Sequence, residues 1–337
     1  MSESEEPCPS TVYTRIPSHV SKYKVIKIIG RGGFAVVVLA QHTITKETVA
    51  IKIINRDIIV KNNLLMYLEN ELRLSTRFNH PNIAKVYDVI YEEDIIMIIM
   101  EYLQNGDLQS LLSRGVYFTI KEQLNIATQV LSGLAYLHSR GISHRDVKPE
   151  NIMFDAHYNP KLIDFGLSKE NGSVLKTYCG TPHFMAPEII LSQNYNGMKA
   201  DLWAYGVTVH IMATGGRFPY TSQNDMQILE QIRENKLELQ IEPKGLIGAI
   251  IEKALTIPME ERPTSADLLA FIEEKRCTNK AISTYTFNQK DIVDTPLPKL
   301  APRNTTPLFI RAQNVNEKSS VLSSLITRVR APHRLSY

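Results

Sequence analysis

The chain has 337 residues, 43% of them apolar and 22% charged, which is enough apolar material for a sizeable core in one or two domains or lobes. The net charge of +3 does not favour nucleic-acid binding, although residues 277–337 carry +6 and the remainder −3. Three cysteines fit no disulfide framework or metal site, and no secretory signal or membrane-spanning run is present, so we expect an intracellular, cytoplasmic protein, with the nucleus left open.

The N-terminal part of the sequence favours strands. Residues 1–22 are polar and contain prolines, so they are predicted to form a flexible segment. Short runs rich in β-branched residues then predict an antiparallel sheet. These runs are residues 23–29, 36–41, 48–54, 83–91 and 95–100. Leucines at helical spacing from Leu64 to Leu72 predict one helix between the third and fourth strands, ending before Pro81.

From residue 107 onward the pattern is mostly helical. Helices are predicted at residues 124–138, 202–213, 226–234, 244–255 and 265–274. The second of these is apolar on nearly all sides, which predicts a buried helix. The fold class is therefore α+β, with a small strand-rich part before a larger helical part. Beyond residue 276 the periodicity stops and prolines are frequent, so residues 277–337 are predicted to be a basic, irregular extension.

A glycine-rich segment lies between the first two predicted strands. It consists of Gly30, Arg31, Gly32, Gly33, Phe34, Ala35, Val36 and Val37. Glycines allow backbone amides to approach a phosphate without an intervening side chain. A plain glycine hairpin is the alternative interpretation. A dinucleotide-binding loop is less favoured, because a strand follows the segment where that motif requires a helix.

A lysine and a glutamate are candidates for an ion pair near this segment. Lys52 lies on the next strand, on the same face as Ala50, where it can reach a bound phosphate. Glu71 falls in the middle of the apolar face of the predicted helix, where a charge is costly unless it is paired. Glu69 projects to the edge of that face. We therefore predict that Glu71 holds Lys52.

Two short motifs give the strongest chemical signal. They are His144-Arg145-Asp146-Val147-Lys148-Pro149-Glu150-Asn151 and Asp164-Phe165-Gly166. Phosphoryl transfer requires an oriented hydroxyl, neutralised phosphate charge and Mg²⁺ on the phosphates. Asp146 can orient and accept from the hydroxyl, and Lys148 can stabilise the transferred group. Asn151 and Asp164 supply the oxygen ligands that Mg²⁺ prefers.

With these motifs in this order, residues 23–276 resemble the eukaryotic protein kinase family. The runs HRDVKPEN, CGTPHFMAPE and HPNI are most similar to the calcium/calmodulin-dependent kinase-like group of its serine/threonine class. The resemblance implies a two-lobed fold, with a small antiparallel-sheet lobe at residues 23–103 and a mainly helical lobe at residues 104–276. It also implies ATP- and Mg²⁺-dependent phosphorylation of serine or threonine in protein substrates, in intracellular signalling.

The resemblance implies roles for further residues. Those around the nucleotide would be Ile29, Val37, Ala50 and Met153 at the adenine, Met100 as gatekeeper, Glu101 and Leu103 in the hinge, and Asp107 at the ribose. Asp201 would bind the backbone of the catalytic loop, which is residues 144–151. Thr181 would lie against Asp146 and Lys148, and Glu188 would pair with Arg262.

Activation is expected to involve Thr177, in the loop between Asp164 and Glu188. Phosphorylation, by the protein itself or by an upstream kinase, would add about −1.5 to −2 charges there. Arg145 and Lys169 are the predicted cationic partners of that phosphate. The loop would then become ordered around the substrate site.

Three residues depart from the family pattern. Ala35 replaces the third glycine, and a methyl group is small enough to be tolerated. Ser75 replaces an apolar residue that would stack toward Phe165, which removes packing from the active arrangement. Ile211 stands where kinases directed to basic substrates carry an acid, which argues against a strong preference for upstream arginines.

Two alternatives concern the whole chain and its end. A catalytically inactive kinase-like protein would normally have lost Lys52, Asp146, Asn151 or Asp164, and all four are present. At the end of the chain, apolar residues from Val321 to Val329 form a helical stripe beside arginines. This pattern is typical of a segment that binds calmodulin or another acidic partner, of a segment that lies on a membrane surface, or of an irregular basic extension.

Overall fold

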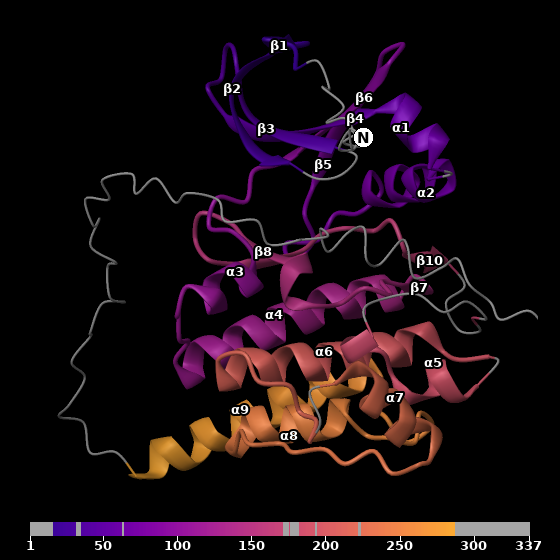
Figure 1. Cartoon of the computed structure of the whole chain (residues 1–337). Coiled ribbons are helices and arrows are strands. Elements are labelled where there is room, and N and C mark those ends of the chain that lie inside the picture. The colour runs from indigo at the N-terminus through magenta and orange to yellow at the C-terminus, as the bar shows by residue number, and fades with distance from the viewer. Residues whose placement is uncertain are drawn as a thin grey trace, which may run out of the picture.

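The structure is a computed structural model, and it describes most of the chain between residues 16 and 286. The described residues are 16–31, 35–62, 64–170, 175, 182–192, 194–221 and 224–286. They form two lobes, with the indigo sheet of the N-terminal lobe above the helices of the C-terminal lobe (Figure 1). The predicted two-lobed α+β organisation is confirmed.

The small lobe is built on one antiparallel sheet in the order β1-β2-β3-β4-β6-β5. Its strands are β1 (His19–Val20), β2 (Tyr23–Arg31), β3 (Ala35–His42), β4 (Thr48–Asn55), β5 (Val86–Tyr91) and β6 (Ile95–Glu101). One face buries a β-branched cluster that includes Val38, Ile51 and Ile99. The other face packs on helix α2 (Leu65–Ser75) through Leu68 and Leu72. This packing places the face of α2 that carries Glu71 toward the sheet.

The small lobe differs from the sequence predictions at three points. Strand β1 lies inside the predicted flexible segment, because Val20 is buried and β1 pairs with β2. Helix α1 (Arg56–Lys61) was not predicted, since six residues are too few to show a helical period; the Asn55 side chain accepts from the Ile58 amide at 3.1 Å and caps it. The strand predicted at residues 83–91 begins at Val86, because buried Ile83 forms a single bridge to Leu162 instead.

The large lobe is mainly helical. Its helices are α3 (Leu108–Ser113), α4 (Ile120–His138), α5 (Pro187–Leu191), α6 (Gly197–Thr214), α7 (Asp225–Arg233), α8 (Gly245–Ala254) and α9 (Ser265–Thr286). Short strands β7 (Ile142–Ser143), β8 (Ile152–Phe154), β9 (Pro160–Leu162) and β10 (Lys169–Glu170) lie between α4 and α5 in the chain. As predicted, α6 is buried along nearly its whole length.

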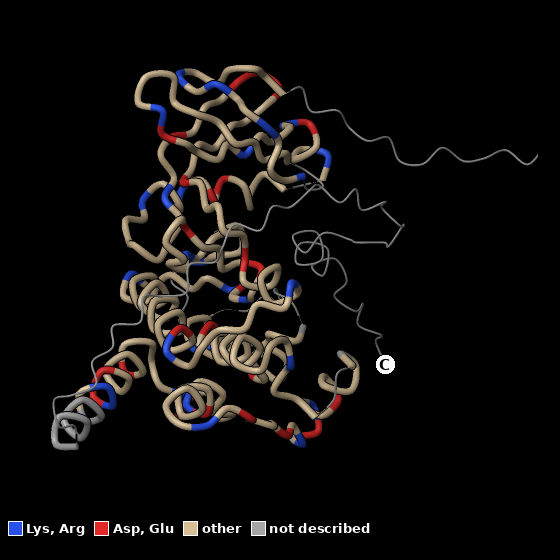
Figure 2. Tube along the Cα trace, turned by 90° about the vertical axis from the view of Figure 1, so that its left-hand side faces the viewer, with Lys and Arg blue, Asp and Glu red and all other residues tan. Residues whose placement is uncertain are grey.

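Acidic and basic residues are interspersed over both lobes (Figure 2). No helix in the described part of the chain is long and apolar enough to cross a membrane.

Helix α9 is longer than predicted. It continues to Thr286, so the first ten residues of the predicted irregular extension are helical. Residues 277–286 contain no glycine or proline, and adding residues to an existing helix needs no new nucleation. Arg276 fixes α9 to α4 by donating to the Leu124 carbonyl and the Thr128 hydroxyl, both at 3.0 Å. The stripe from Val321 to Val329 lies outside the described residues.

A buried ion pair joins α5 to the segment before α9. The guanidinium of Arg262 binds both carboxylate oxygens of Glu188, at 2.7 and 3.0 Å, as predicted. Arg262 also donates to the carbonyls of Thr256 and Lys199, and it is fully buried. Bidentate geometry and added carbonyl acceptors are what allow a charge to remain so far from water.

Arg262→Leu is expected to lower the free energy of unfolding by about 3–5 kcal/mol, because it leaves the Glu188 carboxylate buried without its partner. Arg217 offers a matched control, since its pair with Glu242 lies at the surface, with the two side chains 63% and 49% exposed. Arg217→Leu is expected to cost at most about 1 kcal/mol. Chemical denaturation of both variants measures the difference, and similar losses would show that burial does not decide the contribution of the pair.

Candidate active site

The register of β2, β3 and β4 brings the glycine-rich segment beside Lys52. Gly30 pairs with Val37, and Val37 pairs with Lys52 on the next strand. The three residues therefore lie side by side across the sheet. Gly32, Gly33 and Phe34 of the segment lie outside the described residues. The strand register alone places a lysine next to the segment predicted to receive phosphate.

The predicted ion pair between β4 and α2 is present. Lys52 Nζ lies 2.7 Å from Glu71 Oε1, and the side chains are 28% and 18% exposed. Burial lowers the pKa of Lys52, but the carboxylates of Glu71 and Asp164 more than offset this, so its pKa stands above the ordinary value. Lys52 is thus held as a cation on β4, beside Glu71 of α2. Glu69, which lies on the same helix as Glu71, is exposed.

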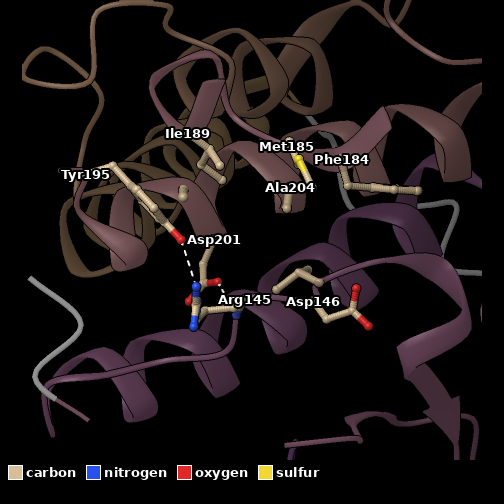
Figure 3. A pocket seen from close by; sticks show the side chains of 10 residues that line it. Arg145, Asp146, Phe184, Met185, Ile189, Tyr195, Asp201 and Ala204 are labelled. Carbon is tan, nitrogen blue, oxygen red and sulfur yellow. Dashed lines mark hydrogen bonds between the residues drawn. The ribbon is translucent and has the colours of Figure 1, made fainter. Parts of the chain in front are cut away.

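The backbone of the catalytic loop is held by a buried aspartate of α6. Asp201 accepts from the amides of His144 and Arg145, each at 2.7 Å, as predicted. Arg145 adopts a left-handed backbone conformation, with φ 71°, which a non-glycine residue keeps only when its surroundings hold it. Figure 3 shows Arg145 and Asp201 beside each other, with the Asp146 side chain pointing away from Asp201. The loop is therefore positioned from the core of the large lobe.

Sequence reasoning missed His138, the last residue of α4. Its Nε2 lies 2.9 Å from Asp201, and its Nδ1 lies 3.0 Å from the Ser265 hydroxyl of α9. A histidine at the end of an amphipathic helix, on its buried side, was the only signal in the sequence. His138 thus links α4, α6 and α9 behind the catalytic loop.

Three polar side chains of the catalytic loop contact one another, and Asp146 is at their centre. Lys148 Nζ lies 2.8 Å from Asp146 Oδ2, and the Asn151 amide donates to the same oxygen at 2.9 Å and to the Asp146 carbonyl at 2.8 Å. Burial raises the pKa of Asp146 above its usual range, although the Lys148 ammonium opposes this shift. A carboxylate oriented by two donors, and more basic than usual, suits the acceptance of a hydroxyl proton.

The second motif begins with a strained residue and continues with a packed ring. Asp164 has a positive φ of 61°, and its Oδ1 accepts from the Gly166 amide at 3.3 Å. The Phe165 ring is buried between His144 and Phe78, with ring centroids 5.1 and 4.8 Å away. Strained residues of this kind concentrate at functional sites.

Ser75 does not supply the apolar contact that its position has in the family. Its side chain is buried, but the hydroxyl donates to the Glu71 carbonyl one turn earlier in α2, at 2.5 Å. The aromatic ring that packs against Phe165 belongs instead to Phe78, three residues after Ser75. The hydroxyl is therefore satisfied within its own helix and makes no link to the large lobe.

The donor set fits Mg²⁺ held together with a nucleotide. Asn151 uses its amide nitrogen toward Asp146, which leaves its Oδ1 as the ligand atom, and Asp164 contributes a carboxylate. Within the described ranges no group of three or more His, Cys, Asp or Glu could hold a metal by itself. Two oxygen ligands suit an ion that completes its shell with phosphate oxygens and water.

Residues assigned to the adenine and ribose form two pairs, one between β4 and β6 and one between β8 and the residue before α3. Ala50 pairs with Met100 across two strands, and Met153 forms a bridge with Asp107. Asp107 also caps α3, accepting from the Ser110 amide at 2.7 Å. The Glu101 carboxylate pairs with Lys161 at 2.7 Å, so its expected contact with the base belongs to its backbone.

Two of the predicted regulatory residues are brought close in the backbone by the pairing of β7 with β10. Lys169 on β10 pairs with Ser143 on β7, two residues before Arg145. Arg145 Nη2 donates to the Tyr195 hydroxyl at 2.9 Å (Figure 3). Thr177 and Thr181 lie outside the described residues. The strand pairing therefore places the backbone of Lys169 two positions from that of Arg145, and the relation of both residues to Thr177 stays a prediction.

Comparison with known proteins agrees with this geometry. The protein kinase domain family matches residues 23–282. CBL-interacting serine/threonine-protein kinase 8 of Arabidopsis thaliana is 34% identical over 74% of this chain and 56% of its own length. The carbon catabolite-derepressing protein kinase of Saccharomyces cerevisiae is 37% identical over 61% and 33%, and serine/threonine-protein kinase SIK2 of Gallus gallus is 32% identical over 79% and 33%.

The chain therefore spans between a third and just over half of the length of these relatives. The family match covers about three quarters of the chain itself, and it includes every motif that carries the site. The match begins at the first residue of β2, Tyr23, and ends inside α9. The predicted resemblance is confirmed, and the chain belongs to the protein kinase domain family.

Proposed function

We propose that the protein transfers the γ-phosphoryl group of ATP to serine or threonine hydroxyls of other proteins, with Mg²⁺. The observation that carries the proposal is the pair of ion pairs formed by the predicted catalytic residues. Lys52 is paired with Glu71 in the small lobe, and Asp146 is paired with Lys148 in the large lobe, where it also accepts a hydrogen bond from Asn151. The names of the relatives and the presence of Lys148 in the catalytic loop support the serine/threonine class.

Each of these residues has a distinct part in the transfer. Asp146 accepts from the substrate hydroxyl and orients its oxygen, and Lys148 brings positive charge to the same place. Lys52, fixed by Glu71, holds phosphate oxygens of the nucleotide. Mg²⁺, when bound at Asn151 and Asp164, neutralises charge on the phosphates. The protein thus acts mainly by positioning and by electrostatic stabilisation.

The direct test is transfer of label from [γ-³²P]ATP with Mg²⁺ to a dephosphorylated protein substrate, followed by phosphoamino-acid analysis. The expected result is phosphoserine or phosphothreonine, and its formation stops when EDTA removes the metal. A protein that binds ATP but transfers no label would instead be a kinase-like binding module. Label found mainly on tyrosine would contradict the proposed class.

The proposal extends to regulation. Phosphorylation of Thr177, by the protein itself or an upstream kinase, would bring a phosphate toward Arg145 and Lys169, whose backbones are close through the β7–β10 pairing. Such a switch suits a role in intracellular signalling. The positive charge of residues 277–337 favours an acidic partner, such as calmodulin, for that segment.

Thr177→Ala is expected to lower kcat/KM at least several-fold, because the two cations lose the phosphate that would order the loop. Ser173→Ala, which removes another hydroxyl of the same loop, is the matched control and is expected to keep the activity of the unchanged protein. Mass spectrometry of the active protein should find phosphate on Thr177. Full activity without phosphate on Thr177 would contradict this assignment.

A further inference from the structure

Helix α2 carries a row of polar side chains on the face that looks toward the large lobe. Asn70, Arg73 and Arg77 are spaced three and four residues apart, so they follow one side of the helix and continue past its end at Ser75. Asn70 is the direct neighbour of Glu71 in the chain. Whatever holds this row therefore also holds the turn of α2 that presents Glu71 to Lys52.

The two arginines bind one carboxylate of the large lobe. Arg73 Nη1 lies 2.6 Å from Glu170 Oε2, and Arg77 Nη1 lies 3.1 Å from Glu170 Oε1. The hydrogen bond from Arg73, followed by the charges of both arginines, holds the pKa of Glu170 below its usual range. Glu170 thus stays ionised near neutral pH and bridges both cations.

Asn70 ties the same helix to the backbone that follows the strained Asp164. Its amide donates to the Ser168 carbonyl at 2.6 Å and to the Phe165 carbonyl at 3.4 Å. Its Oδ1 accepts from Arg73 Nη2 at 3.1 Å. The amide and the ion pairs are therefore one connected network.

The large-lobe end of this network is itself held. Glu170 lies on β10 and pairs with Ile142 of β7, the strand that leads into the catalytic loop. Phe165, whose carbonyl binds Asn70, is packed against His144 of that loop. Along this path, α2 and its Glu71 are connected to the loop that carries Asp146.

A single exposed ion pair contributes little to stability, and these side chains are 37–65% exposed. Two features distinguish this network from an isolated pair. Two arginines share one carboxylate, and a half-buried amide joins them to the backbone, in addition to the packing of Leu74 of α2 in the core of the large lobe. Because one carboxylate serves both cations, ordering its side chain costs entropy only once.

We propose that Asn70, Arg73, Arg77 and Glu170 are positioning residues that hold α2 where the Lys52–Glu71 ion pair is closed. The inference rests on the proposed phosphoryl transfer for its effect on activity. Glu170 supplies the negative charge of this network without any phosphorylation. The network therefore acts from the α2 side whether or not Thr177 is phosphorylated, and it supports basal activity in the Thr177→Ala protein.

Charge reversal with rescue tests the proposal in the full chain. Glu170→Arg places three cations together, so α2 is expected to detach from β10. Two readouts are amide hydrogen exchange of residues 65–75 without nucleotide, and kcat at saturating ATP. We expect faster exchange in α2 and a kcat lower by about five- to thirtyfold, the factor that 1–2 kcal/mol represents. Combining Glu170→Arg with Arg73→Glu and Arg77→Glu is expected to restore both.

Glu242→Arg is the matched control, because it reverses the glutamate of another exposed pair, with Arg217 in the large lobe. It is expected to leave exchange in α2 unchanged. Normal exchange and normal kcat in Glu170→Arg would overturn the proposal, as would a swapped protein in which neither readout recovers. If the unchanged protein transfers no phosphate, the proposed function fails, and the exchange of α2 still decides the inference.

Discussion

Asp146→Asn is expected to lower kcat by about 10²- to 10⁴-fold, the usual loss when a general base is removed. The amide has the same size as the carboxylate, but it cannot accept a proton and it loses the 2.8 Å ion pair with Lys148. Asp146 contacts neither β4 nor α2 in the described hydrogen bonds, so ATP affinity is expected to stay close to that of the unchanged protein.

The measurement compares initial rates at saturating Mg²⁺ and ATP with nucleotide affinity from calorimetry. Asp88→Asn is a matched control, because it makes the same chemical change at an exposed position on β5. A variant at Asp146 that keeps more than about a tenth of kcat falls outside the range for loss of a general base and would remove Asp146 from that role.

Lys52→Met is expected to lower kcat by at least about 10²-fold. Losses of this size are usual when a preorganised group that stabilises transition-state charge is removed. Methionine keeps the length of the side chain and removes the ammonium that Glu71 holds at 2.7 Å. Glu71→Gln is expected to act in the same direction but less strongly, because Lys52 keeps its charge and loses only its fixed position.

Glu69→Gln supplies the control for Glu71→Gln, since both change a glutamate on the same helix. Glu69 is exposed and has no part in the ion pair. Steady-state rates for the three variants, with thermal stability measured alongside, separate the role of the pair from effects on folding. Damage from Glu69→Gln together with a harmless Glu71→Gln would show that the 2.7 Å ion pair is not the functional one.

The sequence by itself determined the order of the main elements and most of the candidate site. Asp146, Lys148 and Asn151 lie within six residues, so their meeting in one loop follows from chain geometry. Glu71 could be assigned because the helical period places it on an apolar face, where a charge requires a partner. Signals of this kind are local, since they depend only on spacing along a strand or helix.

The tertiary structure alone decided which distant residues meet. Arg73 and Glu170 are 97 residues apart, and Arg77 and Glu170 are 93 apart. Exposed charges follow no period that would identify their partner, so this connection of α2 to β10 had no signal in the sequence. The same holds for Phe78, which contacts Phe165 from beyond the end of α2. Burial and periodicity determine which face a residue takes, whereas the packing of the two lobes determines what that face touches.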